Sequence, residues 1–170
     1  MLKQTSMSKL KKTNTYQRQL EEAAFEKYGS FHYDTTSNKI IYKRKEGIVD
    51  CKQTPKVYVW LHLLDNEEEE IIYVGKTKYP ITGRMAQHRQ GFKGKANNGS
   101  VSGSKKHIKL IEILEKNHSV EIWARKAENK MLEINGIAKK QISHLSVEEE
   151  FFIECFDPDL NKDKSIKVYK

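Results

Sequence analysis

The feature that most constrains the fold is a pair of apolar segments on either side of a short acidic loop. Residues 57–64 are rich in β-branched and aromatic side chains, and a similar run from Ile71 to Val74 stops at Gly75. The loop between them, residues 65–70, holds five acidic side chains. Branched and aromatic residues favour strands, and a polar loop marks the place where one strand turns into the next. The sequence therefore predicts two antiparallel strands joined by a short loop.

Periodicity and turn residues predict the elements around this pair. Upstream, a helical stripe runs from Tyr16 to Tyr28 and stops at Gly29, and residues 31–44 suit a hairpin outside the main core. Downstream, the sequence predicts in order a helix from Thr82 to Gly91, a helix capped by Ser104 with the stripe Ile108, Leu110, Ile111 and Leu114, a strand over 120–124, a hairpin with a type I′ turn at Asn135-Gly136, and a helix from Ser146 to Cys155.

The order strand, strand, helix, helix, strand, helix indicates an α/β (α+β) fold with a small antiparallel three-stranded central sheet flanked by helices. A chain of 170 residues with 37% hydrophobic residues can fill one such core. We expect a flexible basic arm over 1–14, a helix and hairpin extension over 15–50, and a core over 51–170 with an inserted hairpin near 127–143.

The positive charge of the chain is concentrated in one segment. The formal net charge is +8, yet residues 71–111 contain no Asp or Glu and nine Lys or Arg residues. The rest of the chain holds 22 basic and 23 acidic residues, so this one segment carries the whole excess. A long segment of a single sign favours contact with phosphates. Nucleic acid is the leading partner, ahead of a membrane surface.

Other classes of protein fit less well. No apolar run approaches the roughly 18 residues that span a bilayer, and the start of the chain lacks the apolar core of a signal peptide. The two cysteines, Cys51 and Cys155, form no CxxC pair and suggest neither a disulfide framework nor a zinc site. We expect a cytoplasmic protein with reduced thiols and no membrane partner.

Five motifs occur in a fixed order. Lys56-Val57-Tyr58 lies on the first strand and Tyr73-Val74-Gly75-Lys76 on the second, with Arg84 and His88 one helical turn apart on the next helix. Near the end, Glu149 precedes an apolar pair and the run from Phe156 through Pro158 to Asn161. This series resembles the GIY-YIG nucleases over about residues 56–161. It departs from them at Lys56, where the family has glycine, and in the longer stretch 127–143.

The resemblance implies phosphodiester hydrolysis, which needs an activated water and stabilisation of charge on phosphorus. We expect Tyr58 to act as the base with Tyr73 in support, although the sequence leaves open which tyrosine it is. A nearby Lys76 or Arg84 would lower the pKa of the base. Arg84 would also clamp the scissile phosphate, and His88 would bind the attacking water or a phosphate oxygen.

The remaining expected site residues hold metal or DNA. Glu149 would bind one divalent cation per active site, Mg²⁺ with Mn²⁺ able to substitute, because the basic segment offers no second carboxylate. Ser146 and Glu149 also have capping-box spacing, which is a competing structural role. Asn161 would support a backbone or Glu149 through its amide. The expected DNA contacts are Lys78, Arg89, Lys93, Lys95, Lys105, Lys106 and His107.

Only nine residues follow Asn161, which favours a small type II restriction endonuclease of this superfamily. Its partners would be double-stranded DNA with a short palindromic site, a second copy in a homodimer, and a cognate DNA methyltransferase as a genetic partner. Two alternatives stay open: a homing or DNA-repair nuclease with the same core, and a non-catalytic nucleic-acid-binding protein. The combination of tyrosine, arginine and glutamate argues against the last, because phosphate binding alone has no need for a lone carboxylate in a basic cleft.

Overall fold

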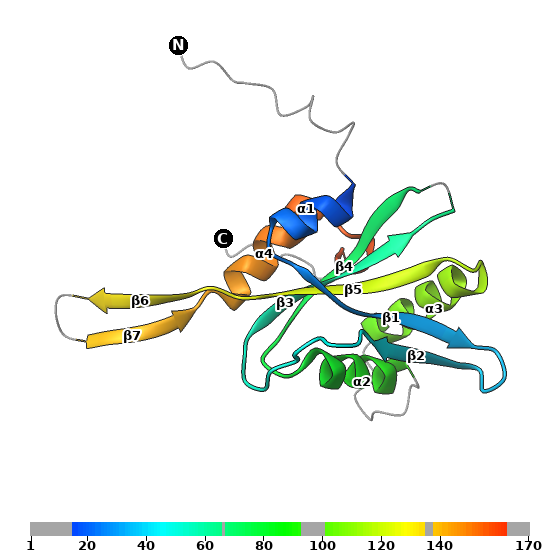
Figure 1. Cartoon of the computed structure of the whole chain (residues 1–170), viewed down its shortest axis with the longest axis horizontal. Helices are drawn as coiled ribbons and strands as arrows, with labels where there is room; N and C mark the ends of the chain where they lie inside the picture. Colours follow the sequence, from blue (N-terminus) through cyan, green and yellow to red (C-terminus); the bar gives the residue numbers. More distant parts are fainter. Residues whose placement is uncertain (1–14, 66, 93–100, 135–137, 163–170) are drawn as a thin grey trace, which may run out of the picture.

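The computed structural model describes residues 15–65, 67–92, 101–134 and 138–162 (Figure 1). The elements of this part of the chain are α1 (Tyr16–Glu22), β1 (Glu26–Asp34), β2 (Lys39–Arg44), β3 (Lys56–Leu63), β4 (Glu69–Thr77), α2 (Ile81–Phe92), α3 (Val101–Glu115), β5 (Ser119–Lys126), β6 (Asn129–Ile134), β7 (Ala138–Ser143), α4 (Leu145–Phe156) and a 3-10 turn, η2 (Asp159–Asn161). The expected basic arm over 1–14 lies outside the described residues.

A five-stranded antiparallel sheet in the order β2-β1-β5-β3-β4 forms the centre of the fold. β3 lies between β5 and β4 in this sheet, and its residues 56–62 are all buried. Tyr58 and Trp60 join the cluster that packs under α2 and α3, whereas Val57, Val59 and Leu61 pack under α1 and α4. Helices therefore cover both faces of the sheet, as Figure 1 shows, and this confirms the mixed α/β fold.

The N-terminal segment differs from its prediction in two ways. α1 ends at Glu22 because Ala24 adopts a left-handed conformation (φ 59°) and the Phe25 amide closes back on the Leu20 carbonyl at 2.8 Å. Gly29 is not a helix stop but lies inside β1, where an added Cβ would be 2.2 Å from the Lys43 carbonyl oxygen. The following hairpin is also not outside the main core: β1 and β2 extend the three expected strands to five.

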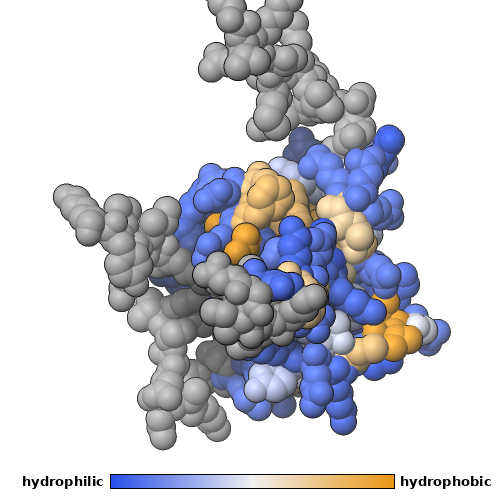
Figure 2. All heavy atoms as spheres, turned by 90° about the vertical axis from the view of Figure 1, so that its left-hand side faces the viewer, coloured by the Kyte–Doolittle hydropathy of each residue, from blue (hydrophilic) through white to orange (hydrophobic). Residues whose placement is uncertain are grey.

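The second hairpin, β6–β7, is confirmed as a separate two-stranded sheet that projects from the body of the molecule (Figure 1). Its predicted type I′ turn falls on residues 135–137, outside the described residues. Met131 is 63% exposed on this hairpin. Figure 2 views the molecule from the side on which the hairpin projects, and this face is mainly hydrophilic with separate apolar patches.

Three predicted helix starts are displaced. α2 begins at Ile81, α3 at Val101 and α4 at Leu145, so none of the expected capping residues Thr82, Ser104 and Ser146 stands before its helix. The side chain of Asp50, 31 positions upstream of Ile81, accepts the first amides of α2 instead. On α3 the expected apolar stripe holds for Leu110 and Leu114, whereas Ile108 is 58% exposed.

None of the helices in the described segments has the length and apolar character that crossing a membrane requires.

Candidate active site

β3 and β4 bring the two motif tyrosines together on one face of the sheet. Tyr58 is opposite Gly75 in the strand register, and Tyr73 is opposite Trp60. The rings of Tyr58 and Tyr73 lie 6.0 Å apart between centroids, within the cluster that α2 and α3 cover. Both side chains are almost fully buried, at 0% and 3% exposure.

Gly75 gives the Tyr58 ring the space that it occupies. A Cβ atom at this position would stand 2.6 Å from both Cζ and the hydroxyl oxygen of Tyr58, and 2.9 Å from the Tyr73 ring. Contacts of 2.6 Å are far below van der Waals separation, so any larger residue would push the ring away. The glycine of the Tyr73-Val74-Gly75 motif is therefore a packing requirement of the other tyrosine.

α2 carries Arg84 and His88 onto the Tyr58 hydroxyl. The Arg84 Nε–H donates to the Tyr58 oxygen at 3.2 Å, and His88 Nε2 lies 2.7 Å from the same oxygen. Because a guanidinium can only donate, the Tyr58 oxygen accepts from Arg84, and we assign its own proton to the contact with His88 Nε2. The assigned tautomer of His88 then carries its proton on Nδ1. The Arg84 Nη1 group is held by Gln87 at 2.9 Å.

The environment sets the protonation of these groups. Burial, and next the proximity of Tyr73, raises the pKa of Tyr58 well above its ordinary value of 10.0, and Arg84 offsets only part of this shift. Arg84 lowers this pKa as predicted, but the expected net lowering is wrong because desolvation outweighs the charge. Burial, aided by the charges of Lys106 and Arg84, lowers the pKa of His88 to about 2. His88 is thus neutral at physiological pH.

Glu149 approaches the tyrosines from α4. It is 5% exposed, and its Oε2 atom lies 2.8 Å from Lys76 Nζ, which also donates to Ser146 Oγ at 2.9 Å. The predicted capping box is wrong: α4 starts one residue early, at Leu145, with His144 in the capping position and no side-chain cap. Ser146 and Glu149 instead share Lys76, so the carboxylate faces β4.

A pocket of about 460 Å³ opens where β4, α2, α3 and α4 meet. Glu149 is the only acidic side chain among its lining residues, which are Tyr73, Lys76, Thr77, Lys78, Tyr79, Arg84, Gln87, Lys106, Leu145 and Glu149. Tyr73 forms part of the wall, while the hydroxyl of Tyr58 lies behind it against Arg84 and His88. Sequence reasoning missed Gln87, although its position three residues after Arg84 on a helix was a usable signal.

The residues expected to contact DNA fall into different environments. Lys78 and Lys105 are exposed, whereas Arg89 and His107 are partly buried. Lys106 is 8% exposed, with its Nζ atom 3.9 Å from the centroid of the Tyr73 ring, so it belongs to the pocket wall rather than to an outer surface. Lys93 and Lys95 lie outside the described residues.

Asn161 fixes the edge strand of the sheet. Its Oδ1 accepts from the Val74 amide and its Nδ2 donates to the Val74 carbonyl, both at 2.8 Å. The Asn161 side-chain amide therefore pairs with the free edge of β4 as a further strand would, next to Tyr73 and Gly75. Asn161 is only 4% exposed. The contact holds the segment after α4 against the motif strand.

The pocket offers one protein ligand for a hard divalent cation. A single buried carboxylate fits a cation completed by phosphate oxygens and water, since Mg²⁺ in phosphate sites commonly keeps several non-protein ligands. The described ranges contain no group of three or more His, Cys, Asp or Glu side chains placed to hold a metal. A site with one carboxylate is thus the arrangement that these residues fit.

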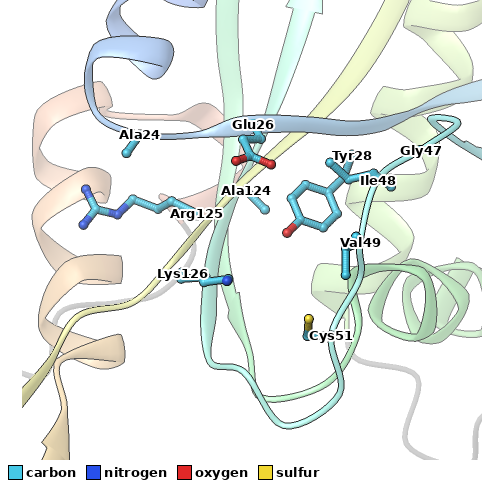
Figure 3. Close-up of a pocket in the computed structure, with 10 residues that line it drawn as sticks. All are labelled: Ala24, Glu26, Tyr28, Gly47, Ile48, Val49, Cys51, Ala124, Arg125 and Lys126. Atoms are coloured by element: carbon cyan, nitrogen blue, oxygen red, sulfur yellow. The ribbon is translucent and has the colours of Figure 1, made fainter.

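A second pocket, of about 490 Å³, lies elsewhere, between β1, β5 and residues 47–51 (Figure 3). It shares no lining residue with the first pocket. Its arginine, Arg125, is already engaged by the Ala23 carbonyl at 2.9 Å and by Glu148 at 3.3 Å. The tyrosine, arginine and glutamate motifs all meet in the other pocket, which is therefore the candidate active site.

Known proteins resemble this chain in sequence over one segment and in fold over most of its length. Residues 55–136 match the family model of the GIY-YIG catalytic domain. The structure is similar to that of a mutant of EndoII from bacteriophage T4, at 22% identity and a TM-score of 0.62 over 86% of this chain and 98% of that one. The restriction endonuclease HPY188I in complex with product DNA aligns at 20% identity and a TM-score of 0.49, over 97% and 91%. No curated protein sequence matches significantly. The segment that carries both tyrosines, Arg84 and His88 is a GIY-YIG nuclease domain.

Proposed function

We propose that this chain is a metal-dependent endonuclease that cuts both strands of DNA at a short palindromic site, as type II restriction enzymes do. The observation that carries this proposal is the pocket that joins Arg84 and Tyr73, from the acid-free basic segment 71–111, to one carboxylate, Glu149 of α4. Phosphate binding alone has no use for a buried carboxylate, which repels a polyanion. A carboxylate beside an arginine and a tyrosine instead suits hydrolysis.

The basic side chains of the pocket would bind the scissile phosphate. Arg84 reaches the pocket wall with its guanidinium held by Tyr58 and Gln87, which fixes its orientation before DNA arrives. Lys76 and Lys106 add positive charge on the same wall. A fixed cation needs little reorganisation when charge develops on the phosphoryl oxygens, and such preorganisation is a large part of enzymatic rate enhancement.

Tyr58 is the residue best connected to accept the proton of the attacking water. Its oxygen would take that proton after releasing its own proton to solvent, with the Arg84 charge at 3.2 Å stabilising the phenolate. The low pKa of His88 makes its imidazole a weak base, so His88 stays neutral and would orient the Tyr58 oxygen at 2.7 Å rather than take its proton. Tyr73 lies closer to the open pocket and is the alternative base.

Glu149 would hold one divalent cation, Mg²⁺ or Mn²⁺, which when bound supplies positive charge next to the scissile phosphate. Since each active site cuts one strand, a palindromic site would be cut by a two-fold homodimer. A cognate DNA methyltransferase would then protect the host sequence.

The test is cleavage of long duplex DNA of known sequence. The proposal expects discrete fragments with Mg²⁺, none in excess chelator, and sedimentation of a dimer on the cognate site. A smear of random products would contradict the restriction role, and full cleavage in chelator would contradict the requirement for a metal. If the protein binds DNA but cleaves it with none of the divalent cations tried, it is a DNA-binding protein and not a nuclease.

A further inference from the structure

Lys56 occupies the position at which the GIY-YIG motif has its first glycine, and the structure gives this lysine a defined set of contacts. It is fully buried, and its ammonium donates to the carbonyls of Cys51 at 3.0 Å and Thr54 at 3.2 Å. Its third neighbour is the Asp50 carboxylate, at 3.6 Å from Nζ to Oδ1. The Asp50 side chain is itself only 3% exposed. Lys56 and Asp50 thus form a buried ion pair, and the lysine ammonium also donates to two backbone carbonyls.

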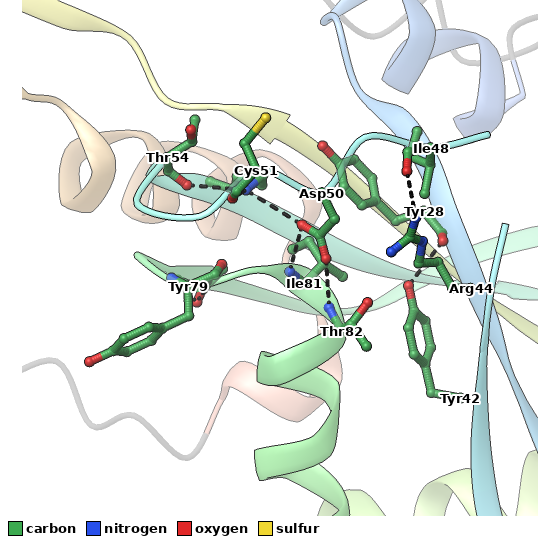
Figure 4. Close-up of polar contacts among 12 residues, drawn as sticks. Tyr28, Tyr42, Arg44, Ile48, Asp50, Cys51, Thr54, Tyr79, Ile81 and Thr82 are labelled. Atoms are coloured by element: carbon green, nitrogen blue, oxygen red, sulfur yellow. Dashed lines mark hydrogen bonds and ion pairs between the residues drawn. The ribbon is translucent and has the colours of Figure 1, made fainter. Parts of the chain in front are cut away.

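Asp50 faces a second element at the same time (Figure 4). Its Oδ1 accepts the Ile81 amide at 2.9 Å and its Oδ2 accepts the Thr82 amide at 3.0 Å, at the start of α2. The residue in the capping position of this helix is Pro80, which has no side-chain acceptor. A carboxylate also complements the positive end of the helix dipole. Asp50 therefore caps α2 from a loop that Lys56 anchors to β3.

These contacts connect the two elements that make the site. Lys56 and Tyr58 are two residues apart on β3, so they lie on the same face of the strand. Arg84 and His88 lie three and seven residues after Ile81 on α2, and both contact the Tyr58 hydroxyl. The helix is thus attached to β3 at two places: at its N-terminus through Asp50 and Lys56, and further along through Tyr58.

We propose that Asp50 and Lys56 are positioning residues, which set the orientation of α2 and so hold Arg84 and His88 on Tyr58. From Ile81 to His88 the helix rises about 10 Å, so a tilt of about 5° at the N-terminus moves His88 by about 0.9 Å. A shift of that size is enough to lengthen the 2.7 Å contact beyond hydrogen-bond range. The proposal rests on the proposed nuclease function for its effect on cleavage, and not for its effect on geometry.

Asp50→Ala removes both cap bonds, and Pro80→Asp supplies a local acceptor for the same helix. The double variant therefore separates helix stability from helix orientation. We expect Asp50→Ala to lower the melting temperature and to slow single-turnover cleavage at least about tenfold, since small misplacements of reacting groups are costly. Adding Pro80→Asp should recover the part of the melting temperature that the cap contributes, since Lys56 still lacks its carboxylate partner, but should not recover the rate. DNA affinity in chelator should stay within about threefold of the parent, because the surface lysines are unchanged.

Three comparisons control this design. Glu46→Ala removes an exposed carboxylate from the same loop and should behave like the parent, as should Pro80→Asp alone. Asp50→Asn keeps one acceptor for the α2 amides and replaces the alanine variant if that variant does not fold. It should lose less activity than Asp50→Ala. Recovery of the rate together with the melting temperature in the double variant would reduce Asp50 to an ordinary cap and overturn the proposal. An unchanged rate in Asp50→Ala would overturn it as well.

A spectroscopic measurement keeps this test independent of catalysis. The imidazole ¹⁵N shifts of His88 report whether Nε2 accepts a hydrogen bond from Tyr58. We expect the accepting signature in the parent and its loss in the Asp50→Ala, Pro80→Asp double variant. If the parent cleaves no DNA, the nuclease proposal fails while this measurement still decides the positioning role: an unchanged His88 signal in the double variant contradicts it.

Discussion

Replacing Gly75 by alanine perturbs the site through one methyl group. The new Cβ would lie 2.6 Å from Cζ and from the hydroxyl oxygen of Tyr58, whereas ordinary contact begins at 3.4 Å. The ring must therefore move by about 0.8 Å. Movement along the Tyr58–His88 direction would stretch the 2.7 Å contact to about 3.5 Å, the limit of a hydrogen bond.

From these distances we expect Gly75→Ala to lose about 1–3 kcal/mol of unfolding free energy, as overpacked cores do, and up to about a hundredfold in cleavage rate. Urea unfolding and single-turnover cleavage measure the two effects. Gly83→Ala is the matched control, because a Cβ there meets no atom within 4 Å and the residue lies inside α2. That change should stabilise the protein by up to about 1 kcal/mol and leave cleavage unchanged. A Gly75→Ala protein with the rate and stability of the parent would refute the packing argument.

Three further variants test single contacts. Tyr58→Phe should slow single-turnover cleavage by at least about a hundredfold and by more than Tyr73→Phe does; the opposite order would assign the base to Tyr73. In the unfolded chain His88 becomes protonated below about pH 6.5, whereas in the folded chain its pKa is lowered to about 2. Between these two values, each pH unit of acidification therefore lowers the unfolding free energy by up to about 1.4 kcal/mol. His88→Gln should therefore weaken the acid dependence of urea unfolding, and parallel curves would contradict the burial of a neutral imidazole. Asn161→Ala leaves the Val74 amide and carbonyl without their partners and should cost about 2–4 kcal/mol in urea unfolding; an unchanged midpoint would contradict that role.

Local patterns in the sequence were sufficient for the sheet core and for the order of the motifs. The strand pair could be predicted because a buried central strand has a continuous run of apolar residues. The end of α1 could not be predicted from the sequence, because the residue that adopts the left-handed conformation there is Ala24 and not a glycine. Tyr28 fits the helical stripe that begins at Tyr16, yet it is buried in β1. An apolar residue at this spacing fits the period of a helix as well as that of a strand, and only the partner strands decide between them.

The errors at the site share a cause, which is dependence on distant residues. Ser146 and Glu149 have capping-box spacing, but the helix begins at Leu145 and the glutamate meets Lys76, 73 positions earlier. Likewise the cap of α2 is Asp50, which no local pattern indicates. The pKa of Tyr58 was misjudged because the sequence shows neighbouring charge but not the degree of burial.

The central claim is that Glu149 serves the chemistry of a nuclease, and Glu149→Gln tests it most directly. Glutamine can still accept a hydrogen bond from Lys76 but is a poor ligand for a hard divalent cation. Glu150→Gln is the control, because Glu150 is exposed on the same helix, whereas Glu148 already accepts the Glu128 amide at 2.6 Å. With Mg²⁺ and duplex DNA, we predict that Glu149→Gln melts near the parent temperature, binds DNA, and cleaves at least about a hundredfold more slowly, a barrier increase of about 2.7 kcal/mol. A Glu149→Gln protein that cuts at the rate of the parent would contradict the account.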